Sequence, residues 1–203
     1  MITITDKIEF IEAFKYPFKE PKRLLYILWI FLPIIGWFAL SGYFVRIVNE
    51  QIKGKYAGLP KLYFMEDLKL GFMMFLKALP FALVYGIFIG AMLYFNEELA
   101  YILNLLLSFF VLPLLALNFY KKQTIESYFE LSILKHAFGN FGAYLLAIIK
   151  QYALFFVFLI LCFLLVGFPA LYVTNSIFLA NFYGRYVEKE ALRTRDEKPY
   201  EVI

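Results

Sequence analysis

Few side chains in this sequence are of the types that carry catalytic or metal-binding chemistry. His136 is the only histidine and Cys162 the only cysteine, so partners for a metal cluster, a nucleophilic triad or an intrachain disulfide are missing. The adjacent acids Glu66–Asp67 and Glu97–Glu98 suggest a general acid and base, but nothing nucleophilic accompanies them and such pairs on polar turns are usually solvated. We therefore expect no enzymatic activity, no catalytic or metal-binding residue and no cofactor.

The elements that position these side chains are dominated by apolar residues. Of 203 residues, 63% are hydrophobic and 21% aromatic, against about 45–50% apolar residues in a soluble domain. Leu99–Tyr120 and Tyr152–Val173 each run for 22 residues without a charged side chain, and about 20 suffice to cross ~30 Å of hydrocarbon. The sequence thus predicts an all-α fold, a polytopic integral membrane helical bundle formed as a single membrane domain over residues 1–203.

We expect four or five membrane-crossing or re-entrant helices, together with two or three amphipathic interfacial helices. Residues 6–16 place apolar side chains on one side of a helix and charged ones largely on the other until Pro17 ends it. Residues 121–141 have a mixed pattern that suggests another surface helix. The predicted membrane elements are residues 24–45, 78–95, 99–120 and 142–187, followed by a polar tail over residues 188–203.

Two of these elements have more than one interpretation. Residues 24–45 contain Pro33 and Gly36, so they form either one span or a re-entrant pair of half-helices. Residues 142–187 contain Gly167–Pro169, which divides them into a transmembrane hairpin or kinks one long helix. If the first segment re-enters and the second is a hairpin, all 20 Lys and Arg residues fall on one side. This arrangement predicts a multi-pass protein of the cell membrane with basic loops and tail in the cytoplasm.

Small residues recur at every fourth position along residues 78–95. They contain a GxxxG pattern, which lets a second helix backbone approach closely. Such a seam serves a homodimer or a gliding surface, or packs within the monomer against Asn104 and Ser108. The helix-packing seam consists of Ala78, Ala82, Gly86 and Gly90.

The net charge of +4 comes from basic residues that flank the apolar runs. Anionic lipid headgroups are therefore expected as partners rather than nucleic acid. Lys77 and Lys150 lie nearest to membrane depth, and their long stems can reach the headgroups. No acid lies inside a candidate span, which argues against a proton-coupled pump. The expected headgroup contacts are Arg46, Lys53, Lys55, Lys77, Lys121, Lys122, Lys150 and Arg185.

The chain contains the short motifs Gly42-Tyr43-x-x-Arg46, Leu59-Pro60, an isolated Gly71 and Gly184-Arg185-Tyr186. Together they resemble a prokaryotic integral-membrane family catalogued as domain of unknown function 4013. The resemblance covers nearly the whole chain, with Lys61 where the family pattern has an acid after Leu-Pro. It implies a polytopic membrane location and brings no activity or catalytic residues with it. The residues that carry it are Gly42, Tyr43, Arg46, Leu59, Pro60, Gly71, Gly184, Arg185 and Tyr186.

The function that fits these features is a non-enzymatic membrane module that assembles with itself or another membrane protein, or organises lipid. The alternative is a small transporter or channel subunit, for which the breaks around Pro33 and Pro169 are the supporting feature. A Phe- and Leu-packed core favours the first. A wet cavity favours the second if it reaches one of the side chains of Asn104, Asn118, Asn175 or Asn181.

Overall fold

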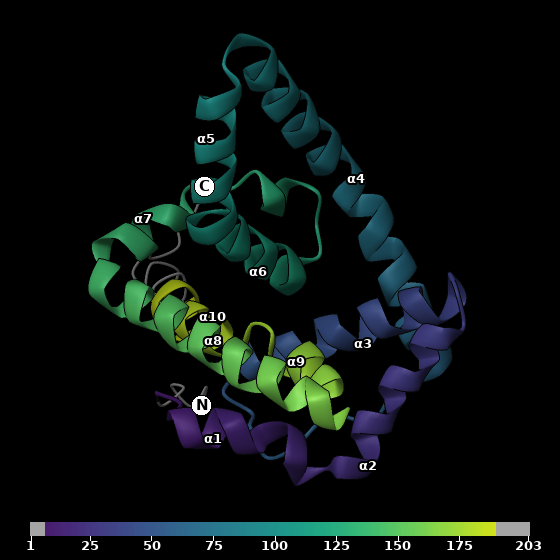
Figure 1. Cartoon of the computed structure of the whole chain (residues 1–203). Helices are drawn as coiled ribbons and strands as arrows, with labels where there is room; N and C mark the ends of the chain where they lie inside the picture. Colours follow the sequence, from purple (N-terminus) through teal and green to yellow (C-terminus); the bar gives the residue numbers. More distant parts are fainter. Residues whose placement is uncertain (1–6, 190–203) are drawn as a thin grey trace, which may run out of the picture. The chain divides into compact units, whose positions relative to one another are not determined.

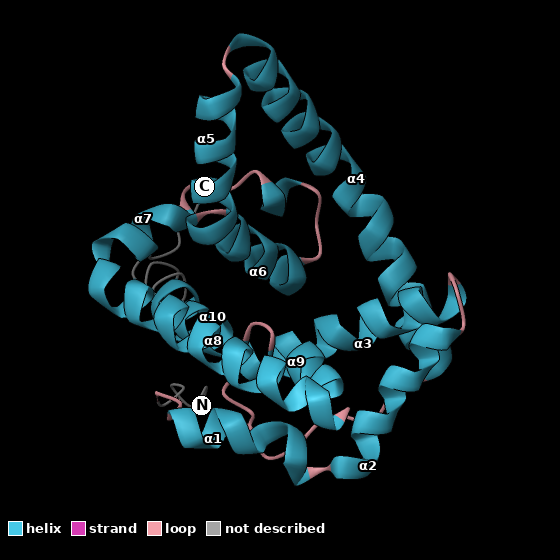
Figure 2. Cartoon of the chain, in the orientation of Figure 1, coloured by secondary structure: helices cyan, strands magenta, loops and turns pink. Residues whose placement is uncertain are grey.

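The computed structural model describes residues 7–189, and every regular element in this part of the chain is helical (Figures 1 and 2). The predicted all-α class is therefore confirmed. In chain order the elements are α1 (Phe10–Lys15), η1 (Tyr16–Lys19), α2 (Pro21–Leu24), η2 (Leu25–Phe31), α3 (Ile35–Ile52), α4 (Phe64–Phe95), α5 (Glu97–Phe110), α6 (Leu112–Lys122), η3 (Glu126–Tyr128), α7 (Ile133–Gly139), α8 (Phe141–Leu161), η4 (Cys162–Leu164), α9 (Gly167–Thr174), α10 (Ile177–Phe182) and the π-helix η5 (Tyr183–Glu188).

The chain forms two compact units. Among the described residues, unit 1 contains 7–24, 47–59 and 135–189, whereas unit 2 contains 25–46 and 60–134. Helix α3 begins in unit 2 and ends in unit 1.

Fewer helices reach across a membrane than the sequence predicted. Helix α4 has 32 residues and the α8–η4 helix has 24, and both are long and apolar enough to span. The α5–α6 pair adds a third span if it is counted as one, although its two helices meet at 45°. The expectation of four or five crossing or re-entrant helices is therefore wrong for the described residues, which support two or three.

Residues 24–45 fall short because their helix is interrupted. A 3-10 segment, η2, ends at Phe31, and α3 starts only at Ile35. Between them Pro33 lacks an amide proton, and Ile34 adopts a left-handed conformation with φ of 65°, which a β-branched residue rarely does. Pro33 was expected to interrupt this run, and the chain does break there.

Residues 142–187 fall short in their second half. After η4, Leu165 takes a left-handed φ of 59°, and the chain returns along α8 as the short helices α9 and α10, which both pack on α8 (Figure 1). Gly167 is required at this turn, because a Cβ there would lie 2.2 Å from the Cys162 nitrogen. The return leg is too fragmented for either of its helices to span alone.

The two predicted surface helices are shorter than expected. Residues 121–141 contain the end of α6, then η3 and α7, rather than one helix. Within 6–16, α1 covers Phe10–Lys15 and buries its apolar side against protein, since Phe14 stacks on Phe158 of α8 with ring centroids 5.4 Å apart. Residue 6 and residues 190–203 of the predicted tail lie outside the described residues.

A close helix crossing in unit 2 joins α3 to α4. A Cβ on Gly42 would lie 1.9 Å from the Asp67 carbonyl oxygen, and one on Gly71 would lie 1.9 Å from the Phe38 carbonyl oxygen. The backbones therefore touch, in the manner of small-residue helix crossings. The predicted seam is not this contact, because Gly86 is exposed with nothing within 4 Å of its Cβ position. Gly90 is equally open, and Ala82 is exposed.

Substitution by alanine is expected to change the stability of the protein in opposite directions at the crowded Gly71 and at the open Gly86. Gly71→Ala should lower the stability of the protein by about 1–3 kcal/mol or more, because the new methyl group meets backbone and not a movable side chain. Gly86→Ala should raise it by about 0.5–1 kcal/mol, since alanine favours a helix interior and has open space here. Thermal unfolding of both variants in neutral detergent measures the difference, and equal melting temperatures would contradict the crossing.

Candidate functional site

A buried ion pair stands beside the α3–α4 crossing. The Asp67 side chain is 0% exposed, and Arg46 donates to it twice, from Nε to Oδ1 at 2.5 Å and from Nη2 to Oδ2 at 2.8 Å. The Tyr63 backbone nitrogen also donates to Oδ2, at 2.8 Å. Asp67 lies in the first turn of α4, where the helix dipole favours a negative charge. The carboxylate is thus fully coordinated by protein groups, as a buried charge must be.

The same arginine binds the loop that precedes α4. Its Nη2 donates to the Lys61 carbonyl at 2.5 Å, and its guanidinium lies over the rings of Tyr43 and Tyr63, with Cζ 5.8 Å and 5.1 Å from their centroids. Tyr43 donates from its hydroxyl to the Pro60 carbonyl at 2.9 Å. This cluster fastens α3 to the loop and to α4, so its role is architectural.

Several residues that resemble the family motif therefore come together. Gly42, Tyr43, Arg46, Pro60 and Gly71 all lie in this cluster or in the crossing beside it. Their partner was missed: the sequence suggested that Glu66–Asp67 is a solvated pair, but only the first member is exposed.

Other cations predicted to meet headgroups are engaged with the protein. Lys77 Nζ donates to the Gln123 carbonyl at 2.7 Å, just past the end of α6. Lys122 forms an ion pair with Glu130, which also accepts from Asn118 Nδ2 at 3.1 Å. Burial works against ionisation of Glu130, but these two hydrogen bonds outweigh it and lower the pKa of the carboxyl group. Lys53 and Lys55 are exposed, and Lys121 is half-buried.

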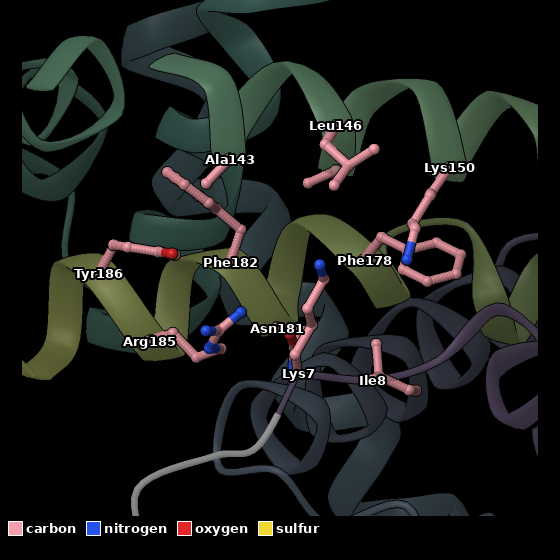
Figure 3. A pocket seen from close by; sticks show the side chains of 11 residues that line it. Lys7, Ile8, Ala143, Leu146, Lys150, Phe178, Asn181, Phe182, Arg185 and Tyr186 are labelled. Carbon is pink, nitrogen blue, oxygen red and sulfur yellow. The ribbon is translucent and has the colours of Figure 1, made fainter. Parts of the chain in front are cut away.

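Lys150 and Arg185, 35 positions apart in the sequence, line one pocket in unit 1 (Figure 3). The cavity has a volume of about 110 Å³ and lies between α8 and the α10–η5 segment, with the start of the described chain on its third side. Lys7 brings another cation to it from that segment. The remaining lining residues are Ile8, Ala143, Leu146, Ala147, Phe178, Asn181, Phe182 and Tyr186.

Aromatic rings and a buried amide hold the polar groups of this pocket. Lys150 Nζ lies 5.7 Å from the Phe178 ring centroid, and Arg185 Cζ lies 5.2 Å from that of Tyr186, distances that allow cation–π attraction. Asn181 is 4% exposed and donates from Nδ2 to the Tyr56 hydroxyl at 2.9 Å. Because the described residues that line it include cations and no acid, the pocket has the electrostatics of an anion receptor.

Two buried glutamines hold the helices that form this wall. Where α9 stops, Gln51 Nε2 donates to the Val173 carbonyl at 2.9 Å and Gln151 Nε2 donates to the Thr174 carbonyl at 2.8 Å. The Oε1 atom of Gln151 then accepts from the Phe178 backbone nitrogen at 3.1 Å, near the start of α10. The break between the two helices is therefore closed by side chains, which fixes where α10 lies on α8.

No family model, curated protein or solved structure matches this chain. The placement of the motif residues therefore comes from the structure alone. The structure gathers one part of the motif at the α3–α4 crossing in unit 2 and places Arg185 and Tyr186 at the pocket in unit 1. Of the predicted seam, Ala82, Gly86 and Gly90 are exposed, whereas Ala78 is half-buried and packs against a buried core cluster. Leu59 is fully buried in unit 1, where its carbonyl accepts a hydrogen bond from Arg23.

Removal of the buried carboxylate should destabilise the protein strongly. Asp67→Ala leaves the Arg46 charge without its partner, and a loss of about 3–5 kcal/mol is expected. Arg46→Ala should have a similar effect, and the double variant should cost less than the sum because both changes break one interaction. Glu66→Ala, next to it but exposed, is the matched control and should change stability by less than about 0.5 kcal/mol. Additive losses in detergent unfolding would contradict the pairing.

Tyr56 should make unit 1 sensitive to alkali. Burial raises the pKa of its phenol from 10.0 to about 12; the Glu12 charge adds to this, whereas the hydrogen bond from Asn181 and the Arg185 charge oppose it. The pKa is raised only in the folded state, so the unfolded chain loses the phenol proton at lower pH. The contribution of Tyr56 to the free energy of unfolding is therefore complete below pH 10 and is lost as the pH rises towards 12. A shift of this size corresponds to about 2–3 kcal/mol. Tyr56→Phe should therefore lose less stability than the wild type over this range, and parallel thermal melts would contradict the assignment.

Proposed function

We propose that this protein is a non-enzymatic membrane module that assembles with itself or another membrane protein, or organises lipid. The observation that carries the proposal is the outward apolar surface of its long helices. Of the 18 most apolar consecutive residues of α4, only 6% are buried within the protein. For α8–η4 the corresponding share is 28%. Hydrocarbon or a membrane partner is the natural cover for such surfaces.

Side chains on both helices support this reading. On α4, Leu83 is 65% and Ile87 71% exposed, and on α8 Phe156 is 61% and Ile160 68% exposed. In this proposal the protein is a multi-pass component of the cell membrane, with basic loops in the cytoplasm and anionic lipid as partner. Membership of the family of unknown function 4013 belongs to the same proposal, and the gathering of motif residues around Gly42 and Arg46 supports it.

A small transporter or channel subunit is the second candidate. The interruptions at Ile34 and Leu165 favour it, since transporters place broken helices at their binding sites. The pocket that reaches Asn181 also favours it. Against it, that cavity has a volume of about 110 Å³, which is below the roughly 300–1,000 Å³ of typical ligand sites.

Reconstitution separates the two candidates. The full chain in liposomes is expected to give no flux of ions, small solutes or fluorescent lipid above that of empty vesicles, because a lipid-organising module has no conduit. The heat-denatured protein reconstituted in parallel controls for leakage. Flux above both controls would overturn the module and support transport.

Gly86→Leu then separates the two forms of the module. Nothing lies within 4 Å of the Gly86 Cβ position, so the larger side chain should not disturb the fold of one copy. A smaller particle in detergent would assign the seam to self-assembly. An unchanged particle size would assign the open face to lipid.

A further inference from the structure

We propose that the pocket between α8 and the α10–η5 segment binds a phosphate group, either that of an anionic lipid headgroup or a free phosphate. The inference rests on the proposed function only for the lipid source. Its basis is the convergence of Lys7, Lys150 and Arg185 from three separate parts of the chain (Figure 3).

Among the described residues, the lining of the pocket contains cations and no carboxylate. None of these three cations takes part in an ion pair with another residue of 7–189. Bringing like charges together is unfavourable at short range, particularly beside apolar walls. A bound anion reverses the sign of this interaction, so the arrangement is favourable when the pocket is occupied.

Lys150 gives the strongest indication of an anionic ligand. It lies about 14 Å along α8 from its first residue, in a helix that is apolar enough to span a membrane. An ionisable residue at such a place requires a partner or a polar ligand. Phe178 supplies an aromatic ring but no negative charge. In this proposal the negative charge that pairs with Lys150 comes from a bound ligand.

The donors suit phosphate in number and type. Arg185 offers a planar fork for two oxygens, and the two lysines offer compact, rotatable ammonium groups. The volume of about 110 Å³ is well above the ~10–15 Å³ needed for a single water and admits a compact group. Apolar side chains of Leu146, Phe178 and Phe182 border the polar groups, as a headgroup joined to acyl chains requires.

A chain of hydrogen bonds connects the pocket to the buried core of unit 1. Asn181 lines the pocket and donates to the Tyr56 hydroxyl, which donates in turn to the Gln51 carbonyl at 2.9 Å. The pocket wall is therefore continuous with the buried polar network that holds α3, α9 and α10. Occupation of the pocket should raise the melting temperature of the full chain, as any ligand of the folded state does.

The test is a ligand-induced thermal shift of the full chain in neutral detergent. Micelles receive phosphatidic acid, phosphatidylglycerol or phosphatidylcholine, and a separate arm receives inorganic phosphate. The double variant Lys150→Gln/Arg185→Gln removes two pocket cations. The matched variant Lys15→Gln/Lys135→Gln removes two exposed cations of the same unit, which controls for diffuse surface charge.

We expect a saturable shift with the anionic lipids and none with phosphatidylcholine. The pocket variant should bind at least about tenfold more weakly, since it loses two charge-assisted contacts, whereas the matched variant should stay within about twofold of the wild type. A saturable shift with inorganic phosphate and the same dependence on the pocket residues assigns a free phosphate instead. Equal affinities of the two double variants would overturn the pocket.

A measurement on the wild type covers the case in which the pocket variant does not fold. Amine acetylation followed by peptide mass mapping should show protection of Lys7 and Lys150 by the phosphate ligand, with Lys15 and Lys135 unaffected. Protection of all four, or of none, would overturn the site. Flux in liposomes would overturn the module function and leave these affinities unchanged, so the two proposals fail separately.

Discussion

The rest of this structure depends on one constraint: the backbone N–H and C=O groups at helix ends have no intrahelical partner and must find another one. In an apolar surrounding each such group costs several kcal/mol unless it finds a partner, and this chain stops its helices often. Side chains of Gln51 and Gln151 close the break between α9 and α10. Cations bind other backbone carbonyl groups, of which Gln123 directly follows a helix and the rest lie in the loop between α3 and α4. Lys19 donates to the Tyr56 carbonyl, Arg23 to Leu59, Arg46 to Lys61 and Lys77 to Gln123.

Breaks within the apolar runs explain why the helix count differs from the hydropathy pattern. Apolar runs correctly indicated α4 and α8, because length and composition suffice for a helix that satisfies its own backbone. Pro33 and the Gly167–Pro169 motif correctly marked interruptions. The pattern did not contain the left-handed residues Ile34 and Leu165, whose conformations depend on packing. Such residues turn apolar runs that are long enough to span into short, returning pieces.

The candidate sites were predictable in part, and for a definable reason. Lys150 and Arg185 were each identified from their place beside an apolar run, but their meeting depends on α10 returning along α8, which no local pattern encodes. The sequence predicts Asp67 as a solvated acid, because its burial depends on Arg46, a partner 21 positions away. The small-residue pattern over Ala78–Gly90 stays a prediction, since Gly86 and Gly90 have open space in one copy. The contact between α3 and α4 uses Gly42 and Gly71 instead, which lie on two different helices and therefore form no repeat in the sequence.

The glutamine at the α9–α10 break has a consequence for the motions of unit 1. Amides in the first turn of a helix ordinarily exchange their protons with solvent quickly, since they have no intrahelical partner. The Phe178 amide is buried and bound to a side chain of another helix. Its proton can therefore leave only when α10 separates from α8. Hydrogen exchange at this one position reports the opening of the whole unit rather than the fraying of a helix end.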